Sequence, residues 1–356
     1  MGLGPDSLDR IARARGDLRV GVPVAVDGEG LVMACESLRA DRLEAAQAMG
    51  AQVALTDWRA ATLKLGAYDG DTVRIALPAD AGVSWVRALA DPSTDLATPL
   101  KGPFRPVRDG TPRLARAGIA LAKSARLLPA VVAVPTPDAA AIAAREGLTL
   151  VTADEVIASA PVSLTRVTGA RLPMEVSPRG RLHVFRPADG TEEHYAVEIG
   201  DPSREAPVLA RLHSACFTGD LLHSLKCDCG PQLRTALARM GAEGAGVLLY
   251  LNQEGRGIGL ANKMRAYALQ DQGFDTVDAN HRLGFRDDER DFRVGAAILR
   301  DLGFGAVRLM TNNPAKIDRM RAEGIAVTER VPLQVGETPQ NADYLATKAA
   351  RSGHLL

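Results

Sequence analysis

The sequence has no excess of charge of either sign and contains few cysteines. Its 43 Lys and Arg residues are balanced by 43 Asp and Glu residues, so no net field draws the chain to a nucleic acid or a membrane. Four cysteines are too few for a disulfide scaffold and indicate a reducing compartment. No apolar run approaches the roughly 20 residues that span a bilayer, and no signal-peptide pattern is visible. We therefore expect a cytoplasmic protein with no nucleic-acid partner and no membrane partner.

Histidine is absent from residues 1–160. Chemistry that depends on a histidine ligand or base is therefore excluded from this half of the chain. The histidines all follow, at His183, His194, His213, His223, His281 and His354.

The composition is that of an ordinary globular protein, with 46% hydrophobic and 24% charged residues. Residues 1–160 alternate strand-like with helix-like runs, which indicates layered helices and sheet. Prolines and glycines interrupt residues 160–180, so we place a domain boundary near residue 165. The predicted fold class is α/β: a mixed α+β domain of residues 1–164, followed by an α/β domain of residues 165–356.

Secondary-structure signals are clear in several segments. The predicted strands are 20–26, 51–56, 72–77, 130–135, 246–251, 306–310 and 325–329. The predicted helices are 43–49, 138–145, 231–240, 288–302, one from Pro314, and one that follows a glycine-rich turn and runs to Gln272. Pro231 at the start and Gly241 past the end support the helix at 231–240.

Three of the four cysteines lie in one stretch, from Arg211 to Gly230. Thiolates hold zinc at about 2.3 Å, and a catalytic zinc site keeps three protein ligands and one open position. Cys216, Cys227 and Cys229 predict such a site. One alternative is three unrelated buried cysteines. A disulfide is disfavoured because two cysteines one residue apart are too tight to bridge, and an odd number leaves a thiol over.

Two further motifs have both a functional and a structural interpretation. The glycine-rich stretch Gln253–Gly259 lies between a predicted strand and a predicted helix, where backbone N–H groups can face a phosphate. It is neither a Walker loop nor the dinucleotide motif, and such turns are often only structural. The acidic stretch Asp287–Asp291 can direct Arg290 and a carboxylate at a substrate, or can simply cap the helix expected at 288–302.

Taken in order, these motifs resemble those of GTP cyclohydrolase II. The matching residues are Cys-x10-Cys-x-Cys at 216–229, Gln-Glu-Gly-Arg at 253–256, Asp-Glu-Arg-Asp-Phe at 288–292 and Thr-Asn-Asn-Pro-x-Lys at 311–316. The resemblance covers about residues 165–356. It implies an enzyme that converts GTP to the diaminopyrimidine of the riboflavin pathway, with release of formate and pyrophosphate. It also implies a homodimer.

The resemblance implies roles for matching residues. Cys216, Cys227 and Cys229 match the ligands of one zinc ion per chain. Asp288 matches the proton acceptor, and Arg290 matches the residue proposed as nucleophile toward the α-phosphate. Tyr267 matches a tyrosine near the guanine ring that is linked to completion of ring opening. The GTP-contact positions are matched by Arg211, Gln232, Glu254, Gly255, Arg256, Thr276, Thr311 and Lys316.

The implied chemistry agrees with these residue types. Zinc lowers the pKa of bound water to about 7, which makes hydroxide available to add to C8 of the guanine. A second hydrolytic step then releases formate. Arginine and lysine side chains, with Mg²⁺ on the GTP phosphates, stabilise charge as pyrophosphate leaves.

At two positions the sequence departs from the family pattern. Ala215 stands where the family has Glu after His-Ser, and Asn252 stands where it has Arg before Gln-Glu-Gly-Arg. The predicted metal ligands and proton-transfer residues are kept, so we expect an active enzyme. The alternative is a GTP-binding regulatory or scaffold protein of the same fold with impaired catalysis.

Residues 8–160 have a faint likeness to 3,4-dihydroxy-2-butanone 4-phosphate synthase, a domain that precedes the cyclohydrolase in many relatives. The stretch 21–34 resembles the opening of that domain. However, its long acidic loop is cut to Asp27–Gly30, and its Gly-His-Thr-Glu metal motif cannot exist without a histidine. We therefore predict a degenerate, non-catalytic domain that serves stability or assembly. The alternative is an unrelated domain with a ligand of its own.

Overall fold

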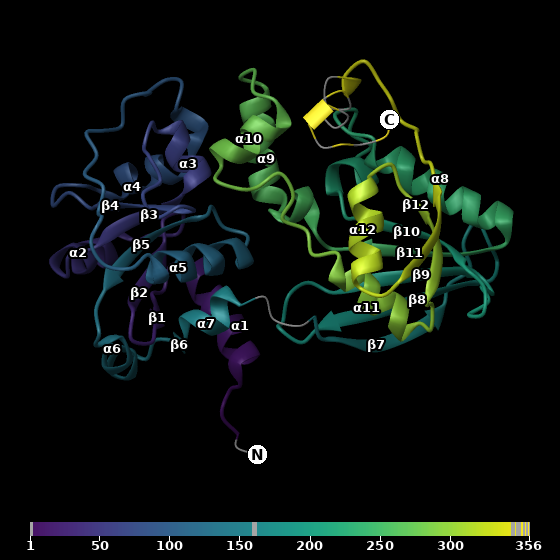
Figure 1. Cartoon of the computed structure of the whole chain (residues 1–356), viewed down its shortest axis with the longest axis horizontal. Helices are drawn as coiled ribbons and strands as arrows, with labels where there is room; N and C mark the ends of the chain where they lie inside the picture. The colour runs from purple at the N-terminus through teal and green to yellow at the C-terminus, as the bar shows by residue number, and fades with distance from the viewer. Residues whose placement is uncertain are drawn as a thin grey trace. The chain divides into compact units, whose positions relative to one another are not determined.

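The computed structural model describes residues 3–158 and 162–342, together with residues 346, 350, 351, 353 and 355. Contacts divide the chain into two compact units (Figure 1). The first unit is Met1–Ala160 with Ala261–Asp288, and the second is Pro161–Leu260 with Glu289–Leu356. The segment Ala261–Asp288 therefore packs with the first unit, although the predicted boundary places its sequence in the second domain. Among the described residues, no helix is long and apolar enough to cross a membrane.

A six-stranded mixed sheet forms the centre of the first unit, with the strand order β4-β3-β5-β2-β1-β6. Neighbouring strands are antiparallel except β1 and β6, which are parallel. The strands are β1 (Val24–Val26), β2 (Gly30–Ala34), β3 (Gln52–Thr56), β4 (Thr72–Ala76), β5 (Ala130–Pro135) and β6 (Leu150–Val151). The helical elements are α1 (Ser7–Arg19), α2 (Ala40–Ala48), α3 (Asp57–Thr62), α4 (Val83–Ala90), η1 (Pro92–Thr94), α5 (Arg113–Ser124), α6 (Ala139–Glu146), α7 (Ala153–Ile157) and, from the later segment, α9 (Leu260–Gln270) and α10 (Thr276–Arg282).

Helix α5 packs directly on this sheet. Leu114 and Leu121 belong to the apolar cluster that fills the space between the helix and the strands. A Cβ atom at Gly118 would lie 2.9 Å from both Val32 and Val131 side chains, so the close approach of helix and sheet requires glycine at this position.

The second unit contains a seven-stranded sheet with the order β13-β12-β10-β11-β9-β8-β7. The four strands β10 to β13 run parallel, and β7 to β9 extend the sheet in antiparallel pairs. The strands are β7 (Leu164–Arg171), β8 (Gly180–Pro187), β9 (His194–Gly200), β10 (Val208–Ser214), β11 (Ala245–Leu251), β12 (Ala306–Met310) and β13 (Ala326–Val331). The helical elements are η2 (Phe217–Leu221), α8 (Cys229–Glu243), η3 (Glu254–Gly257), α11 (Arg293–Asp301) and α12 (Pro314–Ala322).

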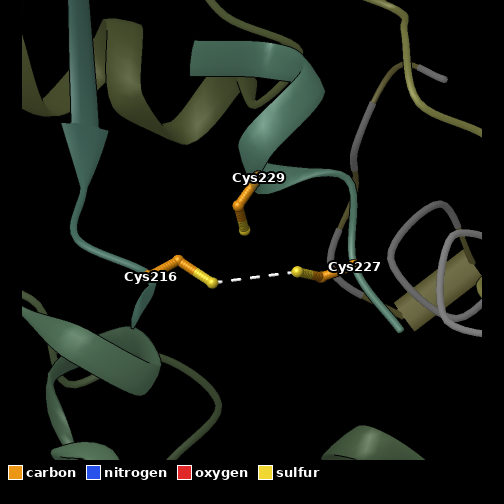
Figure 2. Close-up of side chains that lie close together, drawn as sticks. All are labelled: Cys216, Cys227 and Cys229. Atoms are coloured by element: carbon orange, nitrogen blue, oxygen red, sulfur yellow. Dashed lines mark hydrogen bonds between the residues drawn. The ribbon is translucent and has the colours of Figure 1, made fainter. Parts of the chain in front are cut away.

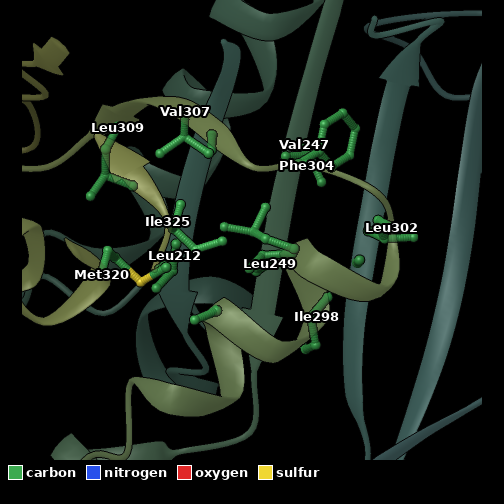
Figure 3. Packing of buried hydrophobic residues seen from close by; sticks show 14 of the residues in the cluster. Leu212, Val247, Leu249, Ile298, Leu302, Phe304, Val307, Leu309, Met320 and Ile325 are labelled. Carbon is green, nitrogen blue, oxygen red and sulfur yellow. The ribbon is translucent and has the colours of Figure 1, made fainter. Parts of the chain in front are cut away.

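Alternate residues of the parallel strands serve opposite faces of this sheet. Leu212 and Leu249 pack in a cluster with residues of α11 and α12, as Figure 3 shows. Leu209 and Leu248, on the opposite face, pack in a second cluster with residues of α8. Burial of each such side chain contributes about 1.5–3 kcal/mol, so the two clusters hold the strand ends in place. The α/β fold class predicted from the sequence is confirmed.

The structure corrects the predicted limits of the helix at 231–240. Helix α8 begins at Cys229 and continues to Glu243. Gly241 lies inside the helix, where an added Cβ would be 2.4 Å from the carbonyl oxygen of Val176. Gly244, with φ of +77°, is the residue that ends the helix. Gly241 is therefore required by packing and not by helix termination.

The helix predicted at 288–302 is also shorter than expected. Helix α11 begins at Arg293, because Glu289 N donates to the Arg256 carbonyl at 3.0 Å and Asp291 accepts from Arg293 N at 3.0 Å. The acidic stretch is therefore a loop that precedes the helix. In addition, the strand predicted at 20–26 is limited to Val24–Val26, and α10 was not predicted.

Candidate active site

The candidate site lies at the carboxyl ends of three adjacent parallel strands. Cys216 follows β10, Gln253 and η3 follow β11, and Thr311 follows β12. In open sheets with parallel strands, ligands bind outside these ends, because the loops from neighbouring strands meet there. Residues far apart in the sequence are thus brought to one edge of the sheet.

Three cysteine sulfur atoms point toward one another at this edge (Figure 2). The Sγ atoms of Cys216, Cys227 and Cys229 all lie within 4.8 Å of one another, and those of Cys216 and Cys227 are 3.7 Å apart. A tetrahedral ion with metal–sulfur distances of about 2.3 Å separates its sulfur ligands by about 3.8 Å. The cluster therefore fits a small tetrahedral metal ion. Within the described residues, it is the one group of three or more Cys, His, Asp and Glu side chains that could hold a metal.

Two glycines allow the cysteines to gather. A Cβ atom at Gly219 would lie 2.7 Å from the Cys227 sulfur and 3.1 Å from the Cys216 sulfur. At Gly230 an added Cβ would be 2.2 Å from the carbonyl oxygen of Gly219. A larger residue at Gly219 would enter the space between the thiols, and one at Gly230 would displace the backbone at Gly219. Gly219 N also donates to the Cys216 sulfur at 3.3 Å.

Two of the three thiols, those of Cys227 and Cys229, have raised pKa values. A hydrogen bond with Cys216 raises the pKa of Cys227, and burial raises it further. Hydrogen bonds with Cys216 and Cys227, followed by burial, raise the pKa of Cys229 well above its ordinary value. A bound metal ion reverses this effect because it deprotonates a coordinating thiol.

Asp220 connects the cysteine cluster to the sheet. One of its carboxylate oxygens accepts from Cys216 N at 3.0 Å and from the Tyr250 hydroxyl at 2.9 Å. The Nε2 atom of His213 lies 3.0 Å from the same oxygen, and the imidazole packs over the Tyr250 ring. Burial lowers the pKa of His213, although the charge of Asp220 acts against this. Asp220 thus fixes the backbone of the first cysteine.

Arg211 is a buried cation beside the cysteine cluster. Its guanidinium donates to the Met310 carbonyl at 2.9 Å and to Gln232 Oε1 at 2.5 Å. Gln232 in turn donates to Asp228, which separates two of the cysteines in sequence, at 2.5 Å. Burial lowers the pKa of Arg211 to about 10, so the side chain keeps its charge at neutral pH.

Three buried polar atoms at this edge of the sheet have no hydrogen-bond partner. They are Arg211 Nε, His213 Nδ1 and Gln253 Oε1, and only one other buried side-chain atom of the described residues, Thr72 Oγ1, shares this state. Buried polar groups in native proteins are nearly always paired, so unpaired ones need a cause such as a ligand. Their clustering beside the cysteines indicates that a polar ligand completes the site.

Two further predicted residues bond to the end of β10. The Arg290 guanidinium donates to Ser214 at 3.2 Å and lies 5.0 Å from the Phe292 ring centroid. The Lys316 ammonium donates to the Leu212 carbonyl at 3.1 Å and lies 5.5 Å from the same centroid. The Phe292 ring therefore lies close to two of the predicted cationic residues.

The glycine-rich turn adopts an unusual backbone. Gly255 and Arg256 both have left-handed conformations, with φ of +62° and +61°. For arginine this conformation is strained, and such strain is concentrated at functional sites. Glu254 holds the turn beside the cysteine cluster, because its carboxylate accepts from Phe217 N, next to Cys216, at 2.6 Å.

The structure therefore brings together most of the predicted site in the second unit. The residues so placed are Arg211, Cys216, Cys227, Cys229, Gln232, Glu254, Gly255, Arg256, Arg290, Thr311 and Lys316. Thr311 is buried and its hydroxyl accepts from Asn313 N at 3.0 Å. Tyr267, Thr276 and Asp288 lie instead in the segment that packs with the first unit. The roles assigned to all these residues stay predictions.

The site also contains four residues that were not among the predicted ones: His213, Asp220, Tyr250 and Gln253. His213 and Asp220 stand three before and four after the first cysteine, and Gln253 begins the glycine-rich motif. These spacings were available as a signal. Tyr250 ends a buried strand, and nothing in its sequence surroundings separates it from a core residue.

Comparison with known proteins connects this geometry to one family. The sequence pattern of GTP cyclohydrolase II matches residues 165–332. The GTP cyclohydrolase-2 of Azospirillum brasilense is 45% identical over 368 residues, which cover 97% of this chain and 94% of that protein. The chain belongs to the GTP cyclohydrolase II family. It is therefore a hydrolase of this type, and GTP is the substrate that the family implies.

Relatives of the family differ in length. The GTP cyclohydrolase-2 of Actinobacillus succinogenes is 56% identical over 193 residues, which are 54% of this chain and 88% of that protein. The enzyme of Escherichia fergusonii is 55% identical over 197 residues, 55% of this chain and 98% of that protein. About half of this chain thus suffices to match a whole family member.

Among solved structures, a two-domain 3,4-dihydroxy-2-butanone 4-phosphate synthase from A. baumannii aligns with 90% of this chain and 99% of its own. The sequence identity is 18% and the TM-score is 0.31. This likeness is too low to establish a shared fold.

Proposed function

We propose that the chain is a zinc-dependent GTP cyclohydrolase II that releases formate and pyrophosphate from GTP in the first step of riboflavin synthesis. The observation that carries the proposal is the meeting of three thiols and three unpaired buried polar atoms at the same strand ends. When bound, zinc supplies Lewis acidity that activates water near neutral pH. Three thiolates leave one coordination position open for that chemistry.

The cationic residues bind the triphosphate in this proposal. Arg211, Arg290 and Lys316 supply positive charge, and Mg²⁺ on the phosphates adds to it as pyrophosphate leaves. Arg211 is the best defined of the three, since its buried Nε donor has no partner and its charge is kept. The remaining contacts to the nucleotide come from Gln232, Glu254, Gly255, Arg256, Thr276 and Thr311.

Proton transfer and ring opening fall to other residues. Asp288 acts as the proton acceptor, Arg290 attacks the α-phosphate, and Tyr267 assists the completion of ring opening. Arg290 is held beside Ser214 and over Phe292, so its position does not depend on substrate. We further propose a cytoplasmic homodimer.

Formate and pyrophosphate assays with the zinc-loaded protein and GTP test this function. We expect both products from the native chain and neither from Arg290→Ala. Truncation of this half-buried side chain should change the free energy of unfolding by less than about 0.5 kcal/mol. Formate release by Arg290→Ala at the native rate would remove Arg290 from the mechanism.

The second candidate is a GTP-binding protein of the same fold with impaired catalysis. Ala215 and Asn252 favour it, because both stand beside site residues and lack the charges that the family has there. Asn252 is committed to structure, since its side chain donates to the Glu193 carbonyl at 2.5 Å. GTP binding without formate, followed by turnover in Ala215→Glu with Asn252→Arg, would support this alternative.

The first unit is proposed to have no synthase activity. Residues 27–29 form the tight turn between β1 and β2, and the carboxylate of Glu29 is paired with Arg113 at 2.9 Å. At Gly30 an added Cβ would lie 2.1 Å from the Val134 carbonyl oxygen, so the turn is packed against β5. Incubation with ribulose 5-phosphate and Mg²⁺ should give no diacetyl-reactive product.

A further inference from the structure

One segment of cyclohydrolase sequence is supported by the first unit. Ala261–Asp288 falls within the range that matches the family, residues 165–332, yet it packs with the first unit. Its helices α9 and α10 have 11 and 7 residues. Even good helix formers need about 12–15 residues to be marginally stable alone in water. The segment therefore depends on the surface against which it packs.

Helix α10 and the turn after it pack on α3, and the two helices are neighbours in Figure 1. The buried hydroxyl of Thr56 donates to the Gly284 carbonyl at 3.0 Å. Gly284 has φ of +85°, and an added Cβ would lie 2.8 Å from that hydroxyl and 2.9 Å from Pro129, so this contact requires glycine. The Trp58 ring stacks on His281, with centroids 3.9 Å apart and planes 19° apart.

Helix α9 is attached by polar contacts. The Arg265 guanidinium pairs with Glu36 at 2.9 Å and lies 3.4 Å from Asp91. The fully buried Asn262 side chain donates to the Arg126 carbonyl at 3.1 Å. These bonds fix both the position and the rotation of the helix on the first unit.

A buried charge cluster supports the end of α10. Asp95 accepts from Arg59 at 2.5 Å and from Lys101 at 2.5 Å, and Arg282 of α10 lies 3.7 Å from it. The Arg282 guanidinium also stacks 3.8 Å above the Phe274 ring. The cluster therefore joins side chains of the segment to the interior of the first unit.

Within the second unit, the residue that follows the segment bonds to the glycine-rich turn. Glu289 N donates to the Arg256 carbonyl at 3.0 Å. A Cβ atom at Gly257 would lie 2.8 Å from the Glu289 backbone. The chain thus leaves after Leu260 and returns at Glu289 beside the turn that carries predicted nucleotide contacts.

We infer that the first unit is a positioning domain for the cyclohydrolase reaction: it fixes the conformation of the segment that carries Tyr267, Thr276 and Asp288. The inference rests on the proposed function for the roles of these three residues. In the Actinobacillus relative, 193 aligned residues make up 88% of the protein, which leaves no room for a comparable unit. We therefore restrict the dependence on a first unit to this chain, in which Trp58 and Glu36 are positioning residues.

Paired double variants of the full chain test this inference. Trp58→Ala with Glu36→Gln removes the stacking on His281 and the negative charge that pairs with Arg265. In the native chain, Leu128 N donates to the Glu36 carboxylate at 2.9 Å, and the amide oxygen of the new glutamine can accept this bond. The matched control is Trp85→Ala with Glu29→Gln. It also removes one aromatic contact, with Phe104, and one ion pair, with Arg113.

We expect amide hydrogen exchange in 261–288 to be about tenfold faster in the test variant and unchanged in the control. Displacement of reacting groups by a substitution far from them can lower the rate by about a hundredfold. We therefore expect kcat for formate release to fall by about tenfold to a hundredfold. Zinc content should stay native in both variants. Trp58→Phe with native Glu36, which keeps an aromatic ring on His281, should exchange and turn over like the native chain.

Two results would overturn the inference. One is faster exchange in the test variant with native kcat and KM. The other is equal loss of activity in the test and control variants, which would indicate general destabilisation. If the native chain releases no formate, the proposed function is wrong, and the inference is then tested by the affinity for GTP. Weaker GTP binding by the test variant than by the control would support a positioning role, and equal binding would contradict it.

Discussion

Arg59 in the first unit and Arg211 in the second are both buried, with 1% and 6% of their surface exposed. All three nitrogens of the Arg59 guanidinium are bonded: Nε donates to the Leu89 carbonyl at 2.7 Å, and the other two bind Asp95 at 2.5 and 3.0 Å. Arg211 bonds neutral oxygens through two nitrogens and leaves Nε without a partner. A fully paired buried charge serves the fold, whereas an incompletely paired one indicates a ligand site.

The same contrast holds for cysteine. Cys35 is buried alone in the first unit, and burial raises the pKa of its thiol far above the ordinary value. Cys227 is one of three thiols within 4.8 Å of one another. Matched substitutions in the two units can therefore test whether one member of each pair serves the fold and the other serves a ligand site.

The largest effect is expected from the cysteine pair. Cys227→Ala should remove most of the zinc and lower formate release by about three powers of ten, because metal catalysis contributes several kcal/mol. Cys35→Ala should keep one zinc per chain and near-native turnover. Metal analysis together with the formate assay gives both values, and stoichiometric zinc in Cys227→Ala would rule out the assigned ligand set.

The arginine pair should separate stability from activity. Arg59→Met leaves Asp95 buried without its main partner and should lower the free energy of unfolding by about 3–5 kcal/mol. Arg211→Met should lower kcat/KM for GTP by about a hundredfold to a thousandfold and change stability by less than about 1 kcal/mol. Urea unfolding and formate kinetics measure these effects. If the two variants lose stability equally, the distinction between the arginines is wrong.

Asp220 should influence the metal through the cysteine backbone. Removal of an outer hydrogen-bond partner typically weakens metal affinity by 10–100-fold, and Asp220→Ala deprives Cys216 N and Tyr250 of their acceptor. Tyr250→Phe removes only one of these bonds and should have a smaller effect. Competition with a zinc chelator measures both affinities; native affinity in Asp220→Ala would show that the carboxylate is not needed.

Asp95 should make the first unit sensitive to acid. Burial alone would raise the pKa of Asp95, but hydrogen bonds and charge from Arg59 and Lys101 outweigh it and lower the pKa below its ordinary value. A depressed pKa contributes stability that is full above the unfolded-state pKa and is lost as the pH falls through the folded-state pKa. The stability difference between native and Asp95→Asn proteins should therefore shrink below about pH 4. A constant difference from pH 7 to pH 3 would contradict this.

Much of this arrangement could be predicted from local sequence. The strand at Ala130–Pro135 and the strand at Ala306–Met310 agree with the predicted limits residue for residue, because apolar runs bounded by turn residues define them. The cluster of Cys216, Cys227 and Cys229 was predicted from spacing, and the structure gathers the three thiols. Metal ligation itself remains a prediction.

Other features depend on contacts between distant residues. From the sequence, Gly241 is expected to end a helix. In the structure it lies inside the helix, where the nearby Val176 carbonyl leaves no space for a side chain. Helix α11 starts late because Glu289 bonds to Arg256, a residue 33 positions earlier in the numbering. The packing of Ala261–Asp288 with the first unit follows from Thr56, Trp58 and their partners. No periodicity or spacing reports such pairings before the chain is folded.

The most direct test of the account uses GTP labelled with ¹³C at C8 of the guanine. Zinc-loaded full-length protein, with Cys227→Ala as the control, is incubated with this GTP, and the products are followed by NMR and a pyrophosphate assay. We expect one labelled formate and one pyrophosphate for each GTP consumed, and neither product in the control. Consumption of GTP with the label retained in the purine ring, or binding of GTP without any product, would contradict it.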